Sequence, residues 1–226
     1  MSEPFDKSYV RYRDGRREFR DFWCKAEPLV KLHLGKNPRF PYLESMFAFF
    51  RMNDGREDAL QFDFGSRSMF RKAPDGSVAA EKGPTLLYLV GPSGDVSTIL
   101  YPAKSNIAIV SEDCIYLRLG FYTSAQLRGW LKVDLDDLIA YTHVTSFDGN
   151  PTLRERVRVF WLRLTRPLGV KNEFTAAAIL RYTGVAAVFA AKAMTISMFR
   201  FILLLVALIG ATTFGITWLA QYLPKF

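Results

Sequence analysis

The sequence has few of the residues that build chemical sites. Its 226 residues include two cysteines, Cys24 and Cys114, and two histidines, His33 and His143. Neither pair has the spacing of a metal site, and two isolated cysteines provide no disulfide framework. No grouping of nucleophiles, bases and carboxylates predicts catalysis. We therefore expect no catalytic residues, no metal and no cofactor, and two ordinary hydrogen-bonded histidines.

A phosphate-binding loop is also missing, although LVGPSGDVSTIL, residues 89–100, begins like one. Such a loop needs a Lys followed by Ser or Thr directly after its second glycine, because these residues hold the phosphates and Mg²⁺. Here Gly94 is followed by Asp95 and Val96. The β-branched residues that follow favour a strand over a helix. The sequence predicts strands at 85–90 and 96–101, joined by a GPSGD turn.

Further apolar runs predict more strands. MFAFFRM (46–52) and ALQFDFG (59–65) flank an Asp-Gly turn signal and are typical of a hairpin. The runs NIAIV and CIYLRLGFY continue the strand character. Together these segments predict an antiparallel sheet of five or six strands.

Helices are expected on both sides of the sheet in sequence. Apolar residues recur at helical spacing before it, at Phe19, Phe22, Trp23 and Ala26. After it, Thr123 stands three residues before Gln126, which predicts a capping box at the start of a second helix. The expected fold class is α+β: an antiparallel β-sheet with flanking helices, followed by a C-terminal helical region with a single transmembrane helix.

Three aspartates lie close together on the second predicted helix. Asp134, Asp136 and Asp137 could hold a divalent cation, but neighbouring helical positions point apart. We expect a solvated face.

Residues 201–220 form an uncharged run, FILLLVALIGATTFGITWLA. At about 1.5 Å per residue it is roughly 30 Å long, which matches the hydrocarbon core of a bilayer. Ala207, Ala211 and Gly215 recur every four residues and would let a second helix approach, so a homodimer through the span is one expectation.

The positive charge is concentrated just before this span. Residues 1–151 contain 20 basic and 20 acidic residues, whereas residues 152–200 contain nine basic and two acidic ones. Basic residues next to a span stay on the cytoplasmic side, and the N-terminus has no apolar signal core. We expect a cytoplasmic domain at 1–150, a basic juxtamembrane helical region at 151–200, the span, and a short non-cytoplasmic tail at 221–226. The expected location is a membrane of the bacterial inner-membrane type.

The segment NPTLRERVRVFWLRLTRP, residues 150–167, is the predicted membrane-surface helix. Asn150 would cap it, with Pro151 at its first position. One side gathers Leu153, Val157, Phe160, Trp161 and Leu164. Arginines occupy much of the rest: Arg154, Arg156, Arg158, Arg163 and Arg166. Such a helix can sink its apolar side into an anionic bilayer, with Trp161 at the interface. The run RVRV also permits an edge strand.

Nucleic acid is an unlikely partner. Residues 7–39 interleave ten basic residues with aromatics, but acidic residues stand among them at three- and four-residue distances. An amphipathic helix with a salt-bridged outer face accounts for this pattern.

These observations favour a single-pass, C-terminally anchored membrane protein whose cytoplasmic domain is an interaction or regulatory module for an unidentified protein partner. The first alternative is a membrane-tethered enzyme. The second, a transport component, needs another span, and the candidate at 174–191 carries Arg181 near its centre. An arginine there costs about 2.5 to 3.5 kcal/mol, so we expect 174–191 to lie on the membrane surface or to lead into the span.

Overall fold

A computed structural model of the chain describes residues 3–56, 58–74, 76–107, 110–170 and 173–175. All of them belong to one unit, residues 1–178. None of the helices in these ranges is both long enough and apolar enough to cross a membrane. The predicted span at 201–220, with Ala207, Ala211 and Gly215, lies outside the described residues, as do residues 176–191.

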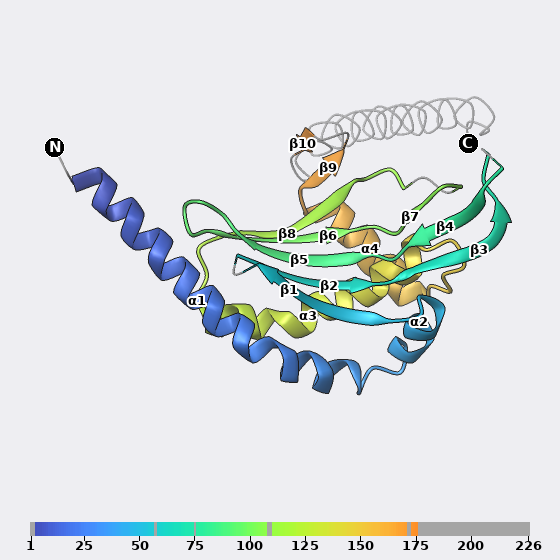
Figure 1. Cartoon of the computed structure of the whole chain (residues 1–226), viewed down its shortest axis with the longest axis horizontal. Coiled ribbons are helices and arrows are strands. Elements are labelled where there is room, and N and C mark those ends of the chain that lie inside the picture. The colour runs from blue at the N-terminus through green and yellow to red at the C-terminus, as the bar shows by residue number, and fades with distance from the viewer. Residues whose placement is uncertain (1–2, 57, 75, 108–109, 171–172, 176–226) are drawn as a thin grey trace, which may run out of the picture. The chain divides into compact units, whose positions relative to one another are not determined.

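The main element is an antiparallel sheet of seven strands in the order β1-β2-β5-β6-β8-β9-β10 (Figure 1). Its strands are β1 (Phe50–Arg56), β2 (Ala59–Phe64), β5 (Thr85–Val90), β6 (Val96–Tyr101), β8 (Cys114–Gly120), β9 (Leu168–Val170) and β10 (Glu173–Thr175). A smaller antiparallel sheet has the order β3-β4-β7. It is formed by β3 (Ser66–Lys72), β4 (Val78–Lys82) and β7 (Lys104–Ser105).

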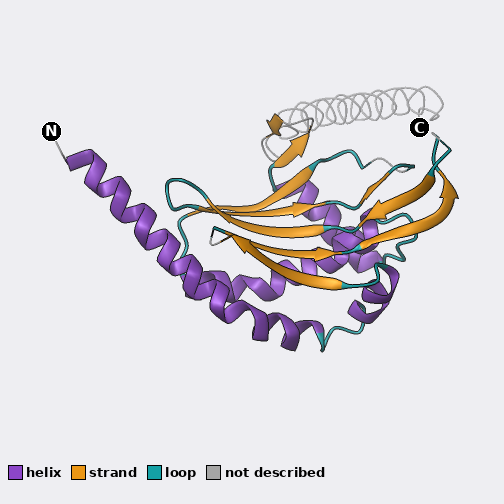
Figure 2. Cartoon of the chain, viewed as in Figure 1, coloured by secondary structure: helices purple, strands orange, loops and turns teal. Residues whose placement is uncertain are grey.

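Four helices complete the described fold, which is α+β (Figure 2). They are α1 (Glu3–Leu34), α2 (Phe40–Met46), α3 (Ser124–Thr145) and α4 (Leu153–Thr165). Alternate residues of the central strands are buried and form one core with the helices. The ring of Phe22 on α1 lies 5.1 Å from that of Tyr88 on β5, between centroids. The predicted α1 face and the Thr123 capping box of α3 are both confirmed.

The predicted hairpins are present, but the start of the first hairpin and the number of strands in the sheet differ from the prediction. The strands flanking GPSGD pair from Thr85↔Tyr101 to Val90↔Val96, as expected. The first hairpin begins later than predicted, because β1 starts at Phe50 and Met46 is the last residue of α2. The sheet is also larger than five or six strands: short segments at 168–175, with too little alternation to be recognised in the sequence, extend its edge.

The arginine-rich segment forms a helix, α4, rather than an edge strand. Its cap differs from the prediction. Thr152, not Asn150, is the N-cap, and its hydroxyl accepts a hydrogen bond from the amide of Glu155 while the Glu155 carboxylate accepts one from the Thr152 amide. A Thr/Glu capping box satisfies two amides at once, whereas Asn150 would satisfy one.

The second glycine of the GPSGD turn, Gly94, packs against helix α1. Gly94 has a positive φ of 84°, and a Cβ on it would lie 2.6 Å from the carbonyl oxygen of Arg11 on α1. A Cβ on Gly15 of α1 would lie 2.2 Å from the Gly94 carbonyl oxygen. The helix and the turn therefore approach backbone to backbone, which only glycine permits at both positions.

The substitution Gly15→Ala should lower the free energy of unfolding by about 1–3 kcal/mol, because its methyl group collides with rigid backbone. Gly129→Ala is the matched control: Gly129 is also helical, and its Cβ would meet no atom within 4 Å. Removing the flexibility of a helical glycine should raise stability there by about 0.5–1 kcal/mol. Urea unfolding of both variants measures the difference, and equal shifts of the same sign would contradict the close approach.

Candidate functional site

Helix α3 is fastened to the sheet by a buried carboxylate. Asp134 accepts hydrogen bonds from the Tyr88 hydroxyl at 2.6 Å and from Arg118 at 2.5 and 2.6 Å. These partners belong to one row across three strands, since Tyr88 pairs with Thr98 and Thr98 pairs with Arg118. Asp134 is fully buried. The row therefore anchors the centre of α3 to β5 and β8.

A β-bulge makes this anchor feasible. The β6–β8 register passes from Thr98↔Arg118 to Ile99↔Tyr116, which leaves Leu117 as an extra residue on β8. Strict alternation would place Arg118 on the face opposite to Leu117. The bulge instead puts Arg118 in the row of Tyr88 and Thr98, on the side of the sheet that α3 covers.

The expectation of a solvated acidic face is wrong for two of the three aspartates. Asp137 is also buried and accepts a hydrogen bond from Arg158 of α4, and only Asp136 is partly exposed. Burial raises the pKa of Asp134 and of Asp137, and Arg118 and Arg158 oppose this shift. The buried carboxylates meet arginines from a strand and from a later helix, and local helical spacing could not reveal either partner.

Replacing Asp134 with Leu should lower the free energy of unfolding by about 3–5 kcal/mol, because it leaves the charge of Arg118 almost buried and unpaired. The double variant Asp134→Leu/Arg118→Met removes both charges and should lose markedly less than the sum of the two single substitutions. Urea unfolding of the four proteins completes the cycle. Additive losses would show that the two side chains do not interact.

The main candidate site is a hollow of about 440 Å³ where the α1–α2 connection, α3 and the start of α4 meet. Most of its lining residues are of polar type, and they come from three distant parts of the chain: His33, Lys36, Asn37, Pro38, Arg39, Lys132, Asp136, Ile139, Ala140, Thr152, Arg154, Glu155 and Arg158. Of these, only Arg154 and Arg158 were named as site residues from the sequence. No local motif joins the others, so only the fold brings them together.

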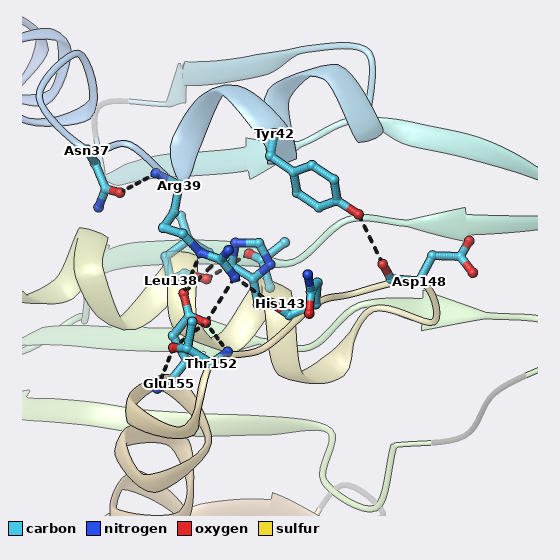
Figure 3. Close-up of polar contacts among 10 residues, drawn as sticks. Asn37, Arg39, Tyr42, Leu138, His143, Asp148, Thr152 and Glu155 are labelled. Carbon is cyan, nitrogen blue, oxygen red and sulfur yellow. Dashed lines mark hydrogen bonds and ion pairs between the residues drawn. The ribbon is translucent and has the colours of Figure 1, made fainter.

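Both carboxylates of the hollow already have partners. Glu155 receives two hydrogen bonds of 3.1 Å from the guanidinium of Arg39, and it also binds Thr152 (Figure 3). Asp136 Oδ1 lies 2.8 Å from His33 Nε2, which confirms the prediction of a hydrogen-bonded His33. The backbone carbonyl of Asn150 accepts a further hydrogen bond from Arg39. Glu155 is thus paired with Arg39, whereas Asp136 is hydrogen-bonded to His33 and lies 4.0 Å from Arg158.

The cations of the hollow outnumber these carboxylates. Five Lys and Arg side chains line it against one Asp and one Glu. Within the part of the chain that the structure describes, the side chains of Lys36, Lys132 and Arg154 have no hydrogen-bond or ion-pair partner, and all three are exposed. The hollow is accordingly electropositive and is suited to an anion.

His143 lies next to Glu155 and differs from its prediction. Among the described residues neither ring nitrogen has a hydrogen-bond partner, although Nε2 is 4.0 Å from Glu155 Oε1. The ring is buried and stacks on Tyr42 at 5.8 Å between centroids (Figure 3). Burial lowers the pKa of His143, with Glu155 opposing and Arg39 adding to the shift. The neutral imidazole is therefore the form that the fold favours.

The protein should lose stability when His143 is forced to take a proton. Because its folded pKa is below the ordinary 6.5, the stabilisation is complete above that value and is lost as pH falls through the folded pKa. Between about pH 7.5 and about pH 5.5 the midpoint of thermal unfolding should fall, and the fall should be smaller in His143→Gln. The shift of Glu155 acts at lower pH, below its ordinary 4.5. Identical profiles for the two proteins would exclude His143 as the cause.

The predicted membrane-surface residues divide into two sets on α4. Arg158 binds Asp137, and Arg163 binds the buried Glu112 at 2.5 Å, so both point toward the domain. The others are exposed: Arg156 and Trp161 on the outer side of α4, Arg154 at the hollow, and Arg166 directly after the helix. A charge reversal at Arg158 or Arg163 would leave a buried carboxylate unpaired, and these two positions are unsuitable for testing a surface.

The apolar side of α4 also faces outward. Only Val159 and Leu162 of this helix are buried. Large apolar side chains on the opposite side are exposed: Leu153 by 78%, Val157 by 57%, Phe160 by 62% and Trp161 by 59%. Leu153, Val157 and Trp161 follow at four-residue steps and Phe160 lies three residues after Val157, so they form a single stripe.

The described residues include no cluster of three or more His, Cys, Asp or Glu able to hold a metal ion. Comparisons of the chain with protein-family models, curated proteins and solved structures find no match.

Proposed function

We propose that this chain is a single-pass membrane protein, anchored by residues 201–220, whose α+β domain is an interaction or regulatory module held at the cytoplasmic surface of a bacterial inner membrane. The uncharged run and the basic region before it support the anchor and the orientation. The same run, through Ala207, Ala211 and Gly215, would mediate dimerisation.

The exposed apolar stripe of α4 is the observation that supports an interaction surface on the domain. Apolar side chains of this size are normally buried, and an exposed contiguous patch marks an interaction site. Arg156 borders the stripe, and Trp161 lies within it. An apolar stripe with a cationic edge matches a membrane interface, where the apolar side enters the acyl boundary and the cation reaches anionic headgroups. The domain would then lie with α4 against the bilayer.

A membrane-tethered enzyme is the second proposal. The observation in its favour is the hollow of converging polar side chains beside α4. His33 and Asp136 are its candidate proton-transfer pair, since a carboxylate that accepts from one imidazole nitrogen orients the ring. We favour the interaction module because each carboxylate of the hollow is already held by a basic side chain.

A fragment spanning residues 1–178 can test the docking of α4, since it contains every described strand and helix but not residues 201–220. It should bind vesicles containing phosphatidylglycerol, and rising salt should release it. An arginine near the surface contributes about 1 kcal/mol, so Arg156→Gln should weaken binding about five-fold. Phe160→Ser/Trp161→Ser should weaken it further by removing the apolar contact.

The matched control is Lys72→Gln, which removes the same single charge from an exposed position on the small sheet. Its vesicle binding should stay near that of the parent fragment. Circular dichroism verifies that each protein is folded. Equal binding to neutral phosphatidylcholine vesicles, or equal losses in the control and the α4 variants, would contradict docking through this helix.

A further inference from the structure

We propose that the hollow between the α1–α2 connection, α3 and α4 is a binding site for a phosphomonoester or diphosphate group attached to a small organic moiety. This site goes beyond membrane docking by α4, because its residues lie at the start of that helix and on other elements.

The hollow is lined by more basic than acidic side chains. Lys36, Lys132 and Arg154 come from a loop, a helix and the first turn of another helix, and their side chains have no partner within the described residues. Three like charges around one hollow repel each other, and a multiply charged anion between them removes that repulsion. A phosphate dianion offers three oxygens, one for each cation.

The start of α4 adds a second anion-binding feature. The first amides of a helix have no intrahelical acceptor, and the helix dipole favours negative charge there. Thr152 and Arg154 of this turn line the hollow. Glu155 takes part in the capping box, but the bidentate contact with Arg39 neutralises its charge. A ligand anion can therefore approach this end of the helix without facing a free carboxylate.

The volume and the apolar part of the lining indicate a ligand larger than a phosphate ion. Its volume of about 440 Å³ falls within the range of roughly 300–1,000 Å³ that small-molecule sites occupy. Pro38, Ile139 and Ala140 provide an apolar lining for an organic portion. The ligand could be a free organic phosphate or the phosphomonoester headgroup of a lipid, since both present the same chemistry.

The soluble arm of the test uses the full chain in a neutral detergent and inorganic pyrophosphate as the probe, measured by calorimetry at constant ionic strength. One equivalent should bind. Lys132→Gln and Arg154→Gln should each weaken binding about tenfold, because each removes one charge-assisted contact. Neither side chain has a partner within the described part of the domain, so both variants should fold. Lys72→Gln, which removes an exposed charge outside the hollow, should bind like the parent.

The lipid arm compares the full chain in nanodiscs that contain equal fractions of phosphatidic acid, a phosphomonoester, or phosphatidylglycerol, a phosphodiester. A higher midpoint of thermal unfolding in phosphatidic acid that Lys132→Gln abolishes, and that Arg156→Gln on the outer side of α4 retains, assigns the site to a lipid headgroup. Pyrophosphate binding without that shift assigns it to a free phosphate. Failure in both arms, or binding that is indifferent to Lys132 and Arg154, overturns the proposal whether or not α4 docks on vesicles.

Discussion

The contact between the Asp134 carboxylate and the Tyr88–Thr98–Arg118 row holds the domain in its arrangement. Asp134 belongs to α3, the helix that packs against α1, α4 and the large sheet. A carboxylate without access to water is stable only when its hydrogen bonds are made, so the position of α3 along the sheet has little freedom. Everything that lies on α3, including Lys132 and Asp136 in the hollow, takes its place from this contact.

The same principle recurs where α4 joins the domain. This helix buries only Val159 and Leu162, which is little apolar surface for thirteen residues. Two ion pairs supply the remaining contacts of α4 with the domain: Arg158 binds Asp137, and Arg163 binds Glu112. The Glu112 carboxylate also accepts hydrogen bonds from the hydroxyls of Ser111 and Tyr141. A helix fastened by charge at a few points can leave its apolar side outward, and that exposed side is the basis of the proposed docking.

Local patterns predicted local structure well. The apolar, β-branched runs at 85–90 and 96–101 around the GPSGD turn, the helical spacing of Phe19 and Phe22, and the Thr123 capping box all depend on neighbours in sequence. The hollow was not predicted, because its residues converge from positions about a hundred residues apart. The burial of Asp134 and Asp137 was not predictable for a related reason. The bulge at Leu117 turns Arg118 toward Asp134, and no pattern in the sequence indicates that bulge.

The edge of the large sheet has a consequence for how the domain responds to tension along the chain. β9 is held to β8 by a short ladder: the pairs Cys114↔Gly169 and Ile115↔Leu168, with backbone hydrogen bonds from the amides of Asp113 and Tyr116 to the carbonyls of Gly169 and Pro167. β10 pairs with β9 over three residues. Short edge strands open at a small fraction of the free energy that unfolds a core. A force applied to the chain beyond residue 175 would therefore act first on this ladder. The ladder would open before the ion pairs of Arg158 and Arg163 on α4 are stretched.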